Sequence, residues 1–516
     1  MPIISLINHN YRFPIQDVLR LFYGRSISDL PTSPPDIQIQ AGDSDTAIQS
    51  IVETVGSSGT DEQTTYRIST VVPSRALVIR SERPIQSEIE IKRELKRQLY
   101  FICAELTGMH FPWGSLTGIR PTYVASQQIQ ELGAEAARRE LTDFFFVEAD
   151  KASLAIETAT TEDRLLEDFN PDDLAIYIGI PFCPTRCSYC SFSSFEGIGR
   201  PAGEMDNYLD ALIHELESIW SNPEVRAQLA PAQVRALYIG GGTPTALTAK
   251  QLQRLCDTLH SLDIPFTPDA EWTVEAGRPD TIDPEKLAIL KQAGFERISV
   301  NPQSMVDETL TRIGRMHGSE AVRIAFEQSR AAGFDNINMD LIAGLAGESR
   351  EEFAYSLAEV LAISPESITV HNLAVKRGSR LHRLMTESEY LHDEGQLAEQ
   401  AIGTLYQPDP DVAWMVAHAR MELEAAGYKP YYLYRQKDGR GGLENVGYAK
   451  PGKANLYNIA MMGDQRSVMG FGAGSSSKHG TGRQANLRNI KQYIDRIDEL
   501  IERKSMMWFS TAETEA

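Results

Sequence analysis

Residues 179–190 read GIPFCPTRCSYC, and the three cysteines of this segment, Cys183, Cys187 and Cys190, are spaced C-x3-C-x2-C. They are three of only five cysteines in a chain of 516 residues. A loop this tight can place three thiolates around one face of a [4Fe–4S] cubane, which leaves the fourth iron without a protein ligand. Such an iron can bind and activate a small molecule. The segment therefore predicts a [4Fe–4S] centre with one open coordination site.

Zinc is the alternative occupant of a cysteine cluster of this kind. A structural zinc site needs a fourth ligand and usually takes its ligands from paired C-x2-C hairpins. The strand that precedes the cysteines, described next, favours the iron–sulfur cluster over zinc.

Short apolar strands alternate with longer helical patterns from residue 174 onward. This alternation is typical of a parallel sheet with right-handed crossovers. Six such units are too few for a complete eight-stranded barrel. We therefore predict the α/β class, with a partial (β/α)6 TIM-type barrel over residues 171–380. The predicted strands are 174–180, 236–240, 271–276, 297–301, 336–340 and 367–371, and the predicted helices are 204–220, 248–262, 283–293, 319–332 and 350–363.

The segments on either side of this core have different patterns. Residues 1–170 predict an N-terminal α+β accessory domain with a small antiparallel sheet followed by helices. Residues 381–516 predict a C-terminal α+β extension that closes the open side of the barrel. Within it, residues 470–478 are rich in glycine and serine and predict a compact turn, and a last helix is expected over 488–503.

Polar residues follow every predicted strand of the core. The strand ends carry the cysteine loop, Gly240–Thr243, Glu275, Asn301 with Gln303, Asp340, and His371 with Asn372. In parallel α/β folds the chemistry gathers at the carboxyl ends of the strands. We expect these groups to face one cavity.

Composition limits the possible partners and location. The formal net charge of −21 disfavours binding to a phosphate backbone, and no dense run of Lys and Arg is present. No stretch of 18 apolar residues predicts a membrane span, and the N-terminal residues lack the pattern of a signal peptide. An odd number of cysteines suits a reducing compartment. A cytoplasmic protein with a small-molecule substrate and no nucleic-acid partner is the expectation.

The cysteine spacing, with the aromatic Tyr189 before the third cysteine, resembles the radical S-adenosylmethionine superfamily. In that superfamily the open iron chelates S-adenosylmethionine, and an electron from the cluster cleaves the sulfonium to give a 5′-deoxyadenosyl radical. The motifs YIGIPFC, GGGTPT, VEAGRPD, NPQS with a later IGR, NMDLIAGL and VHNLA resemble the oxygen-independent coproporphyrinogen III dehydrogenase family. The segment PWGSLTGIRP, with VEAGRPD and KRGS, is similar to the HemZ-like branch of that family.

The resemblance implies a role for each matching residue. Cys183, Cys187 and Cys190 would hold the cluster. The S-adenosylmethionine region would be lined by Tyr177, Tyr189, Gly241, Gly242, Thr243, Glu275, Gln303, Arg315, Asp340 and Ala374, of which Tyr177, Gln303 and Arg315 would be catalytic. Glu275 would accept hydrogen bonds from the ribose diol, and the glycines would let backbone approach the methionine moiety. A second S-adenosylmethionine near Arg315 and Asp340 is also implied.

The implied reaction is oxidative decarboxylation of coproporphyrinogen III propionates to vinyl groups, giving protoporphyrinogen IX. It implies an external electron donor such as flavodoxin or ferredoxin. One position departs from the pattern: Phe192 stands where the dehydrogenases carry a fourth cysteine, and the family's haem chaperones share this feature. A haem-binding chaperone that keeps the cluster and the S-adenosylmethionine site is therefore the alternative. A radical enzyme acting on RNA is a further alternative that the acidity disfavours.

Other notable residues can be interpreted either as structural or as functional. Cys103 and Cys256 lie on apolar helix faces and are expected in the core. His371 could serve either role. The basic segment with Lys376, Arg377 and Arg380 could pair with substrate carboxylates or be a solvated loop. The aromatic run 428–434 could stack on a macrocycle, or it could form a hydrophobic strand.

Overall fold

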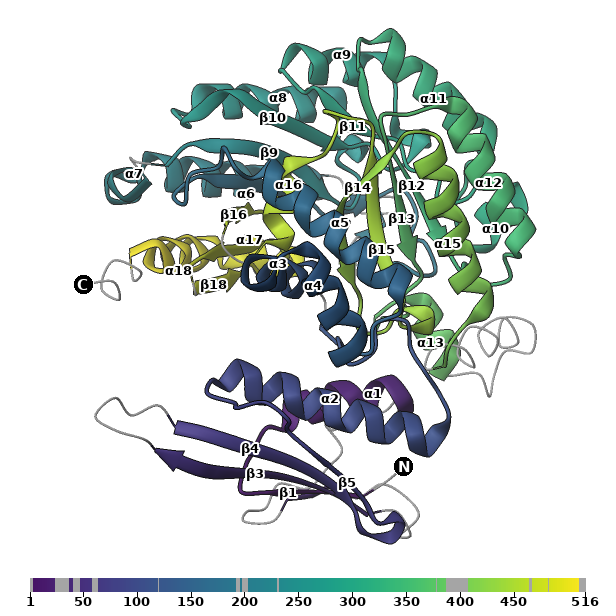
Figure 1. Ribbon diagram of the computed structural model, residues 1–516. Helices are drawn as coiled ribbons and strands as arrows, with labels where there is room; N and C mark the ends of the chain where they lie inside the picture. The colour runs from purple at the N-terminus through teal and green to yellow at the C-terminus, as the bar shows by residue number, and fades with distance from the viewer. Residues whose placement is uncertain are drawn as a thin grey trace. The chain divides into compact units, whose positions relative to one another are not determined.

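A sheet of eleven strands and a smaller sheet of five strands organise the residues that the computed structural model describes (Figure 1). The described residues are 3–23, 37–39, 47–57, 64–118, 120–191, 195–196, 203–229, 232–376, 378–386, 407–463, 466–480 and 482–509. Phe192 and Arg377, which the sequence singles out, lie outside this set.

Six parallel strands form the centre of the large sheet, in chain order from β6 to β13. They are β6 (Leu174–Ile180), β9 (Val234–Gly241), β10 (Phe266–Glu275), β11 (Arg297–Ser299), β12 (Asn336–Ala343) and β13 (Ser367–Asn372). The helices between them are α6 (Glu204–Ser221), α7 (Pro223–Leu229), α8 (Ala249–Ser261), α9 (Pro284–Gln292), α10 (Asp307–Arg312), α11 (Ser319–Ala331) and α12 (Arg350–Ile363). Each strand leads through helix to the next parallel strand, so the predicted partial (β/α)6 barrel is confirmed. Helices α8, α9, α11 and α12 run along the outer side of the sheet (Figure 1).

Capping residues fix where two of these helices begin. Thr248 and Gln251 bond reciprocally to each other's backbone N–H groups at the start of α8, and Ser349 with Glu352 does the same at α12. Such a box satisfies two backbone donors that the first helical turn leaves unbonded. The loops that carry the strand-end residues are therefore anchored at both ends.

Residues that follow the barrel core extend the large sheet at both edges. β14 (Lys429–Arg435) and β15 (Glu444–Ala449) lie beyond β13, and β15 pairs antiparallel with β13. At the other edge β16 (Ser467–Phe471) pairs in parallel with β6, and β17 (Ser476–His479) and β18 (Gly482–Ala485) follow in antiparallel order. The aromatic run 428–434 thus largely forms a strand, as one of its two readings predicts.

The predicted turn over residues 470–478 is wrong in part, because Gly470 and Phe471 end β16 and only the residues before β17 turn. The run is rich in glycine because the chain passes very close to β6. Gly472 has φ 87°, and a Cβ there would lie 2.4 Å from the carbonyl oxygen of Gly179. Glycine is therefore required by contact with another strand as well as by the turn.

Further helices complete this part of the chain: α13 (Arg380–Thr386), α15 (Pro410–Ala425), α16 (Leu456–Met462), α17 (Ile490–Asp495) and α18 (Ile497–Phe509). A fully buried ion pair joins α18 to α6, with 2.5 Å between Lys504 Nζ and Glu215 Oε1. Tyr493 OH and the Gly472 N–H donate to the other carboxylate oxygen of Glu215, at 2.6 and 2.8 Å. This network fastens the C-terminal helices and the end of β16 to the first helix of the barrel.

The N-terminal sheet has the order β2–β1–β3–β4–β5. Its strands are β1 (Ile3–Ile7), β2 (Ile37–Ile39), β3 (Ala47–Ser57), β4 (Thr64–Val72) and β5 (Leu77–Arg80), with α1 (Arg12–Tyr23) and α2 (Glu88–Thr107) packed in the same core. The predicted small antiparallel sheet is mixed, because β1 pairs in parallel with β3. Helix α1 follows β1 and carries the chain away before it returns, which a parallel pair requires. The core position predicted for Cys103 is confirmed, as is that of Cys256 in α8.

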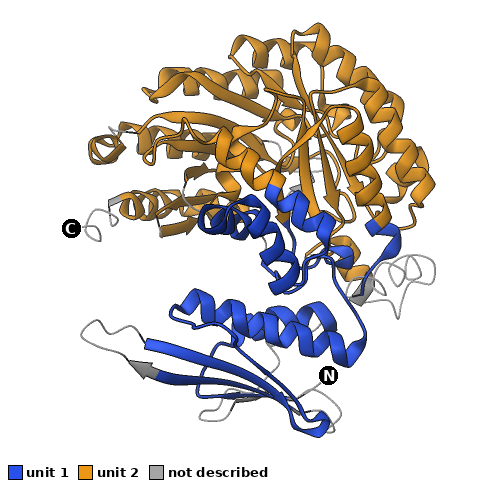
Figure 2. Ribbon diagram, viewed as in Figure 1, with its two compact units in different colours: residues 1–156, 401–413, 435–443 blue, residues 157–400, 414–434, 444–516 orange. Residues whose placement is uncertain are grey.

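The helices α3 (Pro121–Leu132), α4 (Ala134–Arg139) and α5 (Ala149–Leu165) lie between the two sheets in the sequence. The chain forms two compact units, residues 1–156 with 401–413 and 435–443, and residues 157–400 with 414–434 and 444–516 (Figure 2). The three-part division at residues 170 and 380 stays a prediction. Among the described residues, no helix combines the length and the apolar character needed to span a membrane.

Candidate functional site

The cysteine loop leaves the carboxyl end of β6 and is held by backbone hydrogen bonds. Its first part forms the short strand β7 (Phe182–Cys183), which pairs with β8 (Phe195–Glu196). The Cys190 N–H donates to the Cys187 carbonyl at 3.1 Å, so a tight turn brings these two cysteines together. The Ser188 N–H donates to Ile313 O at 2.9 Å, which ties the loop to the segment after α10. The loop is thus anchored to the barrel at both ends.

The three cysteines of the loop lie close to the protein surface or just beneath it. None of them forms a disulfide within the described residues; Cys183 and Cys190 are partly exposed, and Cys187 is 8% exposed. Cys183 Sγ lies 3.4 Å from Thr243 Oγ1. Within the same residues, no three His, Cys, Asp or Glu side chains converge on the position of a single metal ion. A cubane takes one thiolate per iron, so its ligands need no common point.

The glycine triplet 240–242, at the carboxyl end of β9, packs against this loop. The Gly242 N–H donates to Ile180 O at 2.8 Å, and the Thr243 N–H donates to Phe182 O at 2.7 Å. A Cβ on Gly242 would lie 2.6 Å from that Phe182 oxygen, and Gly241 has φ 109°. The glycines are therefore needed for the approach of the cysteine loop itself, apart from any bound molecule.

Glu275, at the carboxyl end of β10, is partly buried beside this triplet. Tyr238 OH donates to one carboxylate oxygen at 2.5 Å, and the Gly241 N–H donates to the other at 3.2 Å. Burial raises the pKa of Glu275 to about 7, although the bond from Tyr238 acts in the opposite direction. This carboxyl group can therefore change protonation state near neutral pH.

Three tyrosine rings are stacked next to Glu275. The rings of Tyr177 on β6 and Tyr238 on β9 both stack on Tyr457 of α16, with centroid distances of 5.7 and 4.4 Å. Burial, and then the nearby Glu275, raise the pKa of the Tyr177 phenol well above its ordinary value. The rings form part of a small apolar cluster with Ala175 and Ala236, which are neighbours on the same face of the sheet. Helix α16 thus fills the space against β6 and β9.

Gln303, four residues after β11, meets Asp340, which lies within β12 because that strand continues to Ala343, beyond its predicted end at residue 340. The Gln303 N–H donates to Asp340 O at 2.8 Å, and Gln303 has φ 69°, a left-handed conformation that is uncommon outside glycine. Burial alone would raise the pKa of Asp340, but His371 lowers it, with 3.6 Å between His371 Nε2 and Asp340 Oδ2. Tyr434 OH lies 3.3 Å from the other ring nitrogen of His371. The aspartate is therefore charged and joined to a chain of polar groups.

Arg315 and Tyr189 lie beside the cysteine loop. Arg315 Nη1 donates to the carbonyl oxygens of Gly277, at 3.2 Å, and Asn301. Burial would lower the pKa of Arg315, but the neighbouring Tyr189 and Cys187 raise it. Burial, and then Cys187, raise the pKa of Tyr189. Of the described buried atoms around this point, Arg315 Nε and Asn301 Oδ1 have no hydrogen-bond partner.

The structure therefore brings most of the predicted residues to one edge of the sheet. Ala374 is two residues beyond the end of β13 and is partly buried, and the Leu373 N–H before it donates to Ala343 O at 3.0 Å. Sequence reasoning missed Tyr238, Tyr457 and Arg278. Tyr238 could have been found from its alternation with Ala236 along β9, but the seven residues of α16 carry no comparable signal.

Comparisons with known proteins assign the chain to a family. The model of the radical SAM superfamily matches residues 177–360. The oxygen-independent coproporphyrinogen-III oxidase-like protein HemZ of Bacillus subtilis is 38% identical over 442 residues, which cover 82% of each chain. The chain belongs to the HemZ-like coproporphyrinogen oxidase family of radical SAM proteins.

Two other proteins are similar to this HemZ-like chain. The heme chaperone HemW of Bacillus subtilis is 32% identical over 323 residues, covering 63% of this chain and 76% of HemW. The solved structure of coproporphyrinogen III oxidase (HemN) from Escherichia coli is 26% identical, covers 66% of this chain and 73% of its own, and has a TM-score of 0.48.

The family assignment gives this HemZ-like protein a [4Fe–4S] cluster and S-adenosylmethionine as cofactors. The residues present fit both groups. Three thiols on one loop suit a cubane with an open iron. The unpartnered Asn301 Oδ1 and Arg315 Nε are a buried acceptor and a buried donor, which native structures rarely leave unsatisfied. A polar ligand beside the cysteine loop would satisfy them.

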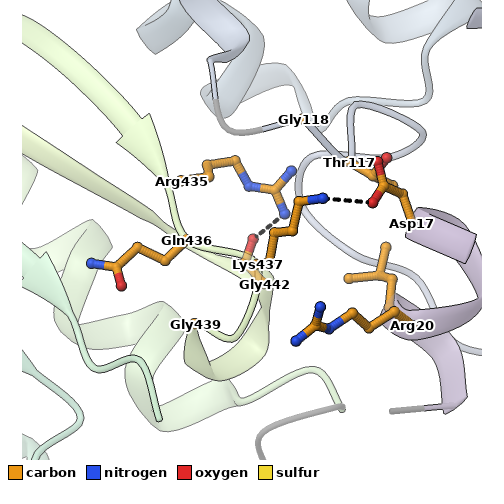
Figure 3. Close-up of a pocket in the computed structure, with 10 residues that line it drawn as sticks. Asp17, Arg20, Thr117, Gly118, Arg435, Gln436, Lys437, Gly439 and Gly442 are labelled. Carbon is orange, nitrogen blue, oxygen red and sulfur yellow. Dashed lines mark hydrogen bonds and ion pairs between the residues drawn. The ribbon is translucent and has the colours of Figure 1, made fainter. Parts of the chain in front are cut away.

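The first unit contains a small pocket of its own (Figure 3). It is lined by residues of α1, by Thr117 and Gly118, and by the segment 435–442, and its cavity of about 30 Å³ has room for about one water molecule. Its charges are paired within the unit: Arg20 with Asp438, and Lys437 with Asp17 at 2.9 Å. It is too small for either cofactor.

Proposed function

We propose that this protein is an oxygen-independent coproporphyrinogen III dehydrogenase that converts propionate side chains to vinyl groups and yields protoporphyrinogen IX. The observation that carries the proposal is the cysteine loop at the carboxyl edge of the barrel, flanked by Glu275 and Arg315. The substrate class is supported by the 38% identity to a coproporphyrinogen-III oxidase-like protein over most of both chains.

The proposal assigns each group at the sheet edge a task. Cys183, Cys187 and Cys190 would hold the cluster. Tyr177, Tyr189, Gly241, Gly242, Thr243, Glu275, Gln303, Arg315, Asp340 and Ala374 would line the S-adenosylmethionine region. Glu275 would accept hydrogen bonds from the ribose diol, and the buried Arg315 would supply a fixed positive charge. When bound, the two cofactors supply a carbon-centred radical that can take hydrogen from an unactivated C–H bond.

The chain's own residues would position the substrate and exclude water. Each propionate would give a hydrogen atom from its β-carbon to the carbon-centred radical, lose carbon dioxide and pass one electron to an external one-electron acceptor, which leaves a vinyl group. The stacked rings of Tyr177, Tyr238 and Tyr457 would keep this region dry, which protects a reactive intermediate from side reactions. Lys376 and Arg380, which follow β13, are candidates to pair with the substrate's carboxylates.

The remaining parts of the proposal concern partners and location. An external one-electron donor such as flavodoxin or ferredoxin would reduce the cluster. A cytoplasmic location and the absence of a nucleic-acid partner are supported by the net charge of −21 and by the reducing environment that a thiolate-bound cluster needs.

A haem-binding chaperone is the second candidate. Phe192 in place of a fourth cysteine and the 32% identity to heme chaperone HemW support it. Incubation of anaerobically reconstituted protein with coproporphyrinogen III, S-adenosylmethionine and dithionite distinguishes the two. Products lighter by one or two formic acid equivalents, seen by mass spectrometry and absent from Cys187→Ser, support the dehydrogenase. Stable haem binding in a 1:1 ratio without such products would support the chaperone and overturn the proposal.

A further inference from the structure

Arg278 is a buried arginine that donates hydrogen bonds to the middle of the cysteine loop, and the proposed function gives it no role. Arg278 is 2% exposed and follows β10, three residues after Glu275. Its Nη1 donates to the carbonyl oxygen of Thr185 at 3.1 Å, and its Nη2 donates to the hydroxyl oxygen of the same residue at 3.0 Å. Thr185 lies midway between Cys183 and Cys187. A guanidinium fork therefore fixes both backbone and side chain at the centre of the C-x3-C segment.

Thr185 is held from a second direction as well. Its hydroxyl group donates to the carbonyl oxygen of Gly314 at 3.2 Å. Gly314 has φ 81°, and a Cβ there would lie 3.3 Å from the Arg186 carbonyl oxygen, so this segment passes close to the loop. Thr185 thus joins the segment after β10 to the segment after α10. Any change in its position would move the cysteines on either side of it.

The charge of Arg278 is balanced by an acid that it holds in place. Arg278 Nε donates to Asp280 Oδ1 at 3.2 Å, and His317 Nδ1 lies 3.5 Å from the same oxygen. Burial alone would raise the pKa of Asp280, but His317 and Arg278 lower it to about 2, so the carboxylate is ionised at neutral pH. Arg278 is almost fully buried, whereas the Asp280 side chain is 30% exposed. Because water screens the Asp280 carboxylate more than the buried Arg278 guanidinium, the positive charge of Arg278 outweighs the negative charge of Asp280 at the cysteine loop.

We propose that Arg278 is a positioning residue for the iron–sulfur cluster, which sets the spacing of the thiolates through Thr185 and raises the cluster's reduction potential through its charge. The inference rests on the three-cysteine site proposed above. Reduction adds one electron, and hence one negative charge, to the cluster. A buried cation beside the loop stabilises that reduced form relative to the oxidised one.

Because Asp280 and Arg278 carry opposite charges, removing one or the other should shift the cluster's reduction potential in opposite directions. Arg278→Gln removes the cation, so the midpoint potential should become more negative. Asp280→Asn removes the anion and should shift the potential in the positive direction. Arg278→Lys keeps the charge but loses the two-pronged contact, so its potential should stay near that of the wild type while less cluster is retained. A merely structural contact would not give shifts of opposite sign.

The experiment uses the full-length chain, reconstituted anaerobically with iron and sulfide. The readouts are iron and sulfide per chain, the midpoint potential from a dithionite titration followed by electron paramagnetic resonance, and the change of that spectrum on adding S-adenosylmethionine. Arg226→Gln, which removes an exposed arginine on α7, is the matched control and should equal the wild type.

Two outcomes separate this inference from the proposed function. If wild-type protein takes up no iron and sulfide, the cluster site itself is wrong. If the wild type loads normally and Arg278→Gln and Arg278→Lys match it in cluster content and potential, Arg278 has no positioning role. If Arg278→Gln does not fold, the other two variants provide the test. Unchanged cluster content in Arg278→Lys together with an unchanged potential in Asp280→Asn would overturn the inference.

Discussion

Tyr238 donates a hydrogen bond of 2.5 Å to the carboxyl group of Glu275, and it does so from the neighbouring strand of the barrel. The two residues lie where a ribose diol would be bound in the proposed function. Because the pKa of Glu275 is raised to about 7, the strength of this acceptor depends on pH within the physiological range.

The first prediction concerns this carboxyl group. As pH rises from 6 to 8, the ionised fraction of Glu275 rises, and a carboxylate accepts hydrogen bonds more strongly than its acid form. We expect S-adenosylmethionine to bind more tightly across that interval. Glu275→Gln should bind about 10-fold more weakly at pH 8, as for the loss of a charge-assisted hydrogen bond of roughly 1.5–3 kcal/mol, and its affinity should not vary with pH. Isothermal titration calorimetry on the cluster-loaded protein measures both effects.

Tyr238→Phe provides the control for the first prediction. Its hydrogen bond lowers the pKa of Glu275, so its removal should move the pH dependence of binding to a higher pH. A wild-type affinity that is constant between pH 6 and 8 would contradict this assignment of Glu275.

The second prediction separates ligand cysteines from core cysteines. Cys183→Ser, Cys187→Ser and Cys190→Ser should each abolish iron and sulfide uptake, because a hydroxyl group is a poor ligand for this cluster. Cys103→Ser and Cys256→Ser should retain it. Both of these thiols are buried, and burial raises the pKa of Cys256 to about 12, so it stays protonated. Iron and sulfide analysis with visible absorption checks the set, and loss of the cluster in both groups would refute it.

The third prediction uses the acid Glu348, a residue that is 9% exposed and whose carboxyl group accepts a hydrogen bond of 2.7 Å from Ser304. Burial raises its pKa to about 8, whereas the unfolded chain has an ordinary carboxyl group. Between pH 4.5 and 8 the folded state therefore holds a proton that the unfolded state releases, and stability falls as pH rises. Glu348→Gln should remove this dependence and stabilise the protein at pH 8 by about 1–3 kcal/mol.

Urea unfolding of the protein without cofactors at pH 5 and pH 8 measures this effect. Gln keeps the oxygen that accepts from Ser304, so folding should be preserved. Glu327→Gln, an exposed position of α11, is the matched control and should leave the pH dependence unchanged. Equal stability of wild type and Glu348→Gln at pH 8 would show that the burial of this acid has no energetic consequence.

The fourth prediction concerns the fully buried pair of Lys504 and Glu215. Lys504→Met leaves the carboxylate buried without its cation and should destabilise the fold by about 3–5 kcal/mol. The double variant Glu215→Gln with Lys504→Met removes both charges, so it should be more stable than the single variant. Thermal unfolding compares the two, and a double variant less stable than Lys504→Met would contradict the reasoning.

The sequence predicts the barrel well and its additions poorly, for physical reasons. The predicted strand 174–180 has the bounds of β6, because its apolar run is bounded by turn-forming residues on both sides. β16 has only five residues and lies next to glycine-rich sequence, so its sequence pattern resembles that of a loop. Its pairing with β6 joins residues nearly 300 positions apart, and no local pattern encodes such a contact.

The candidate site shows the same division. The family motifs predict the cysteines and Glu275, which lie at the ends of strands, and Arg315, which follows α10. They do not identify Tyr457, because its importance comes from α16 packing against β6 and β9. Nor do they identify Arg278, whose role depends on a contact with Thr185, 93 residues earlier.

The order of synthesis gives the pairing of β6 with β16 a biological meaning. β6, which delivers the cysteine loop, has β9 on one side and β16 on the other, and β16 is made from residues 467–471 near the end of the chain. A ribosome must therefore translate residues 467–471 before the strand next to the thiols has both neighbours. Iron delivery in the cell should accordingly follow synthesis of β16, and a product that is terminated before residue 467 should stay colourless.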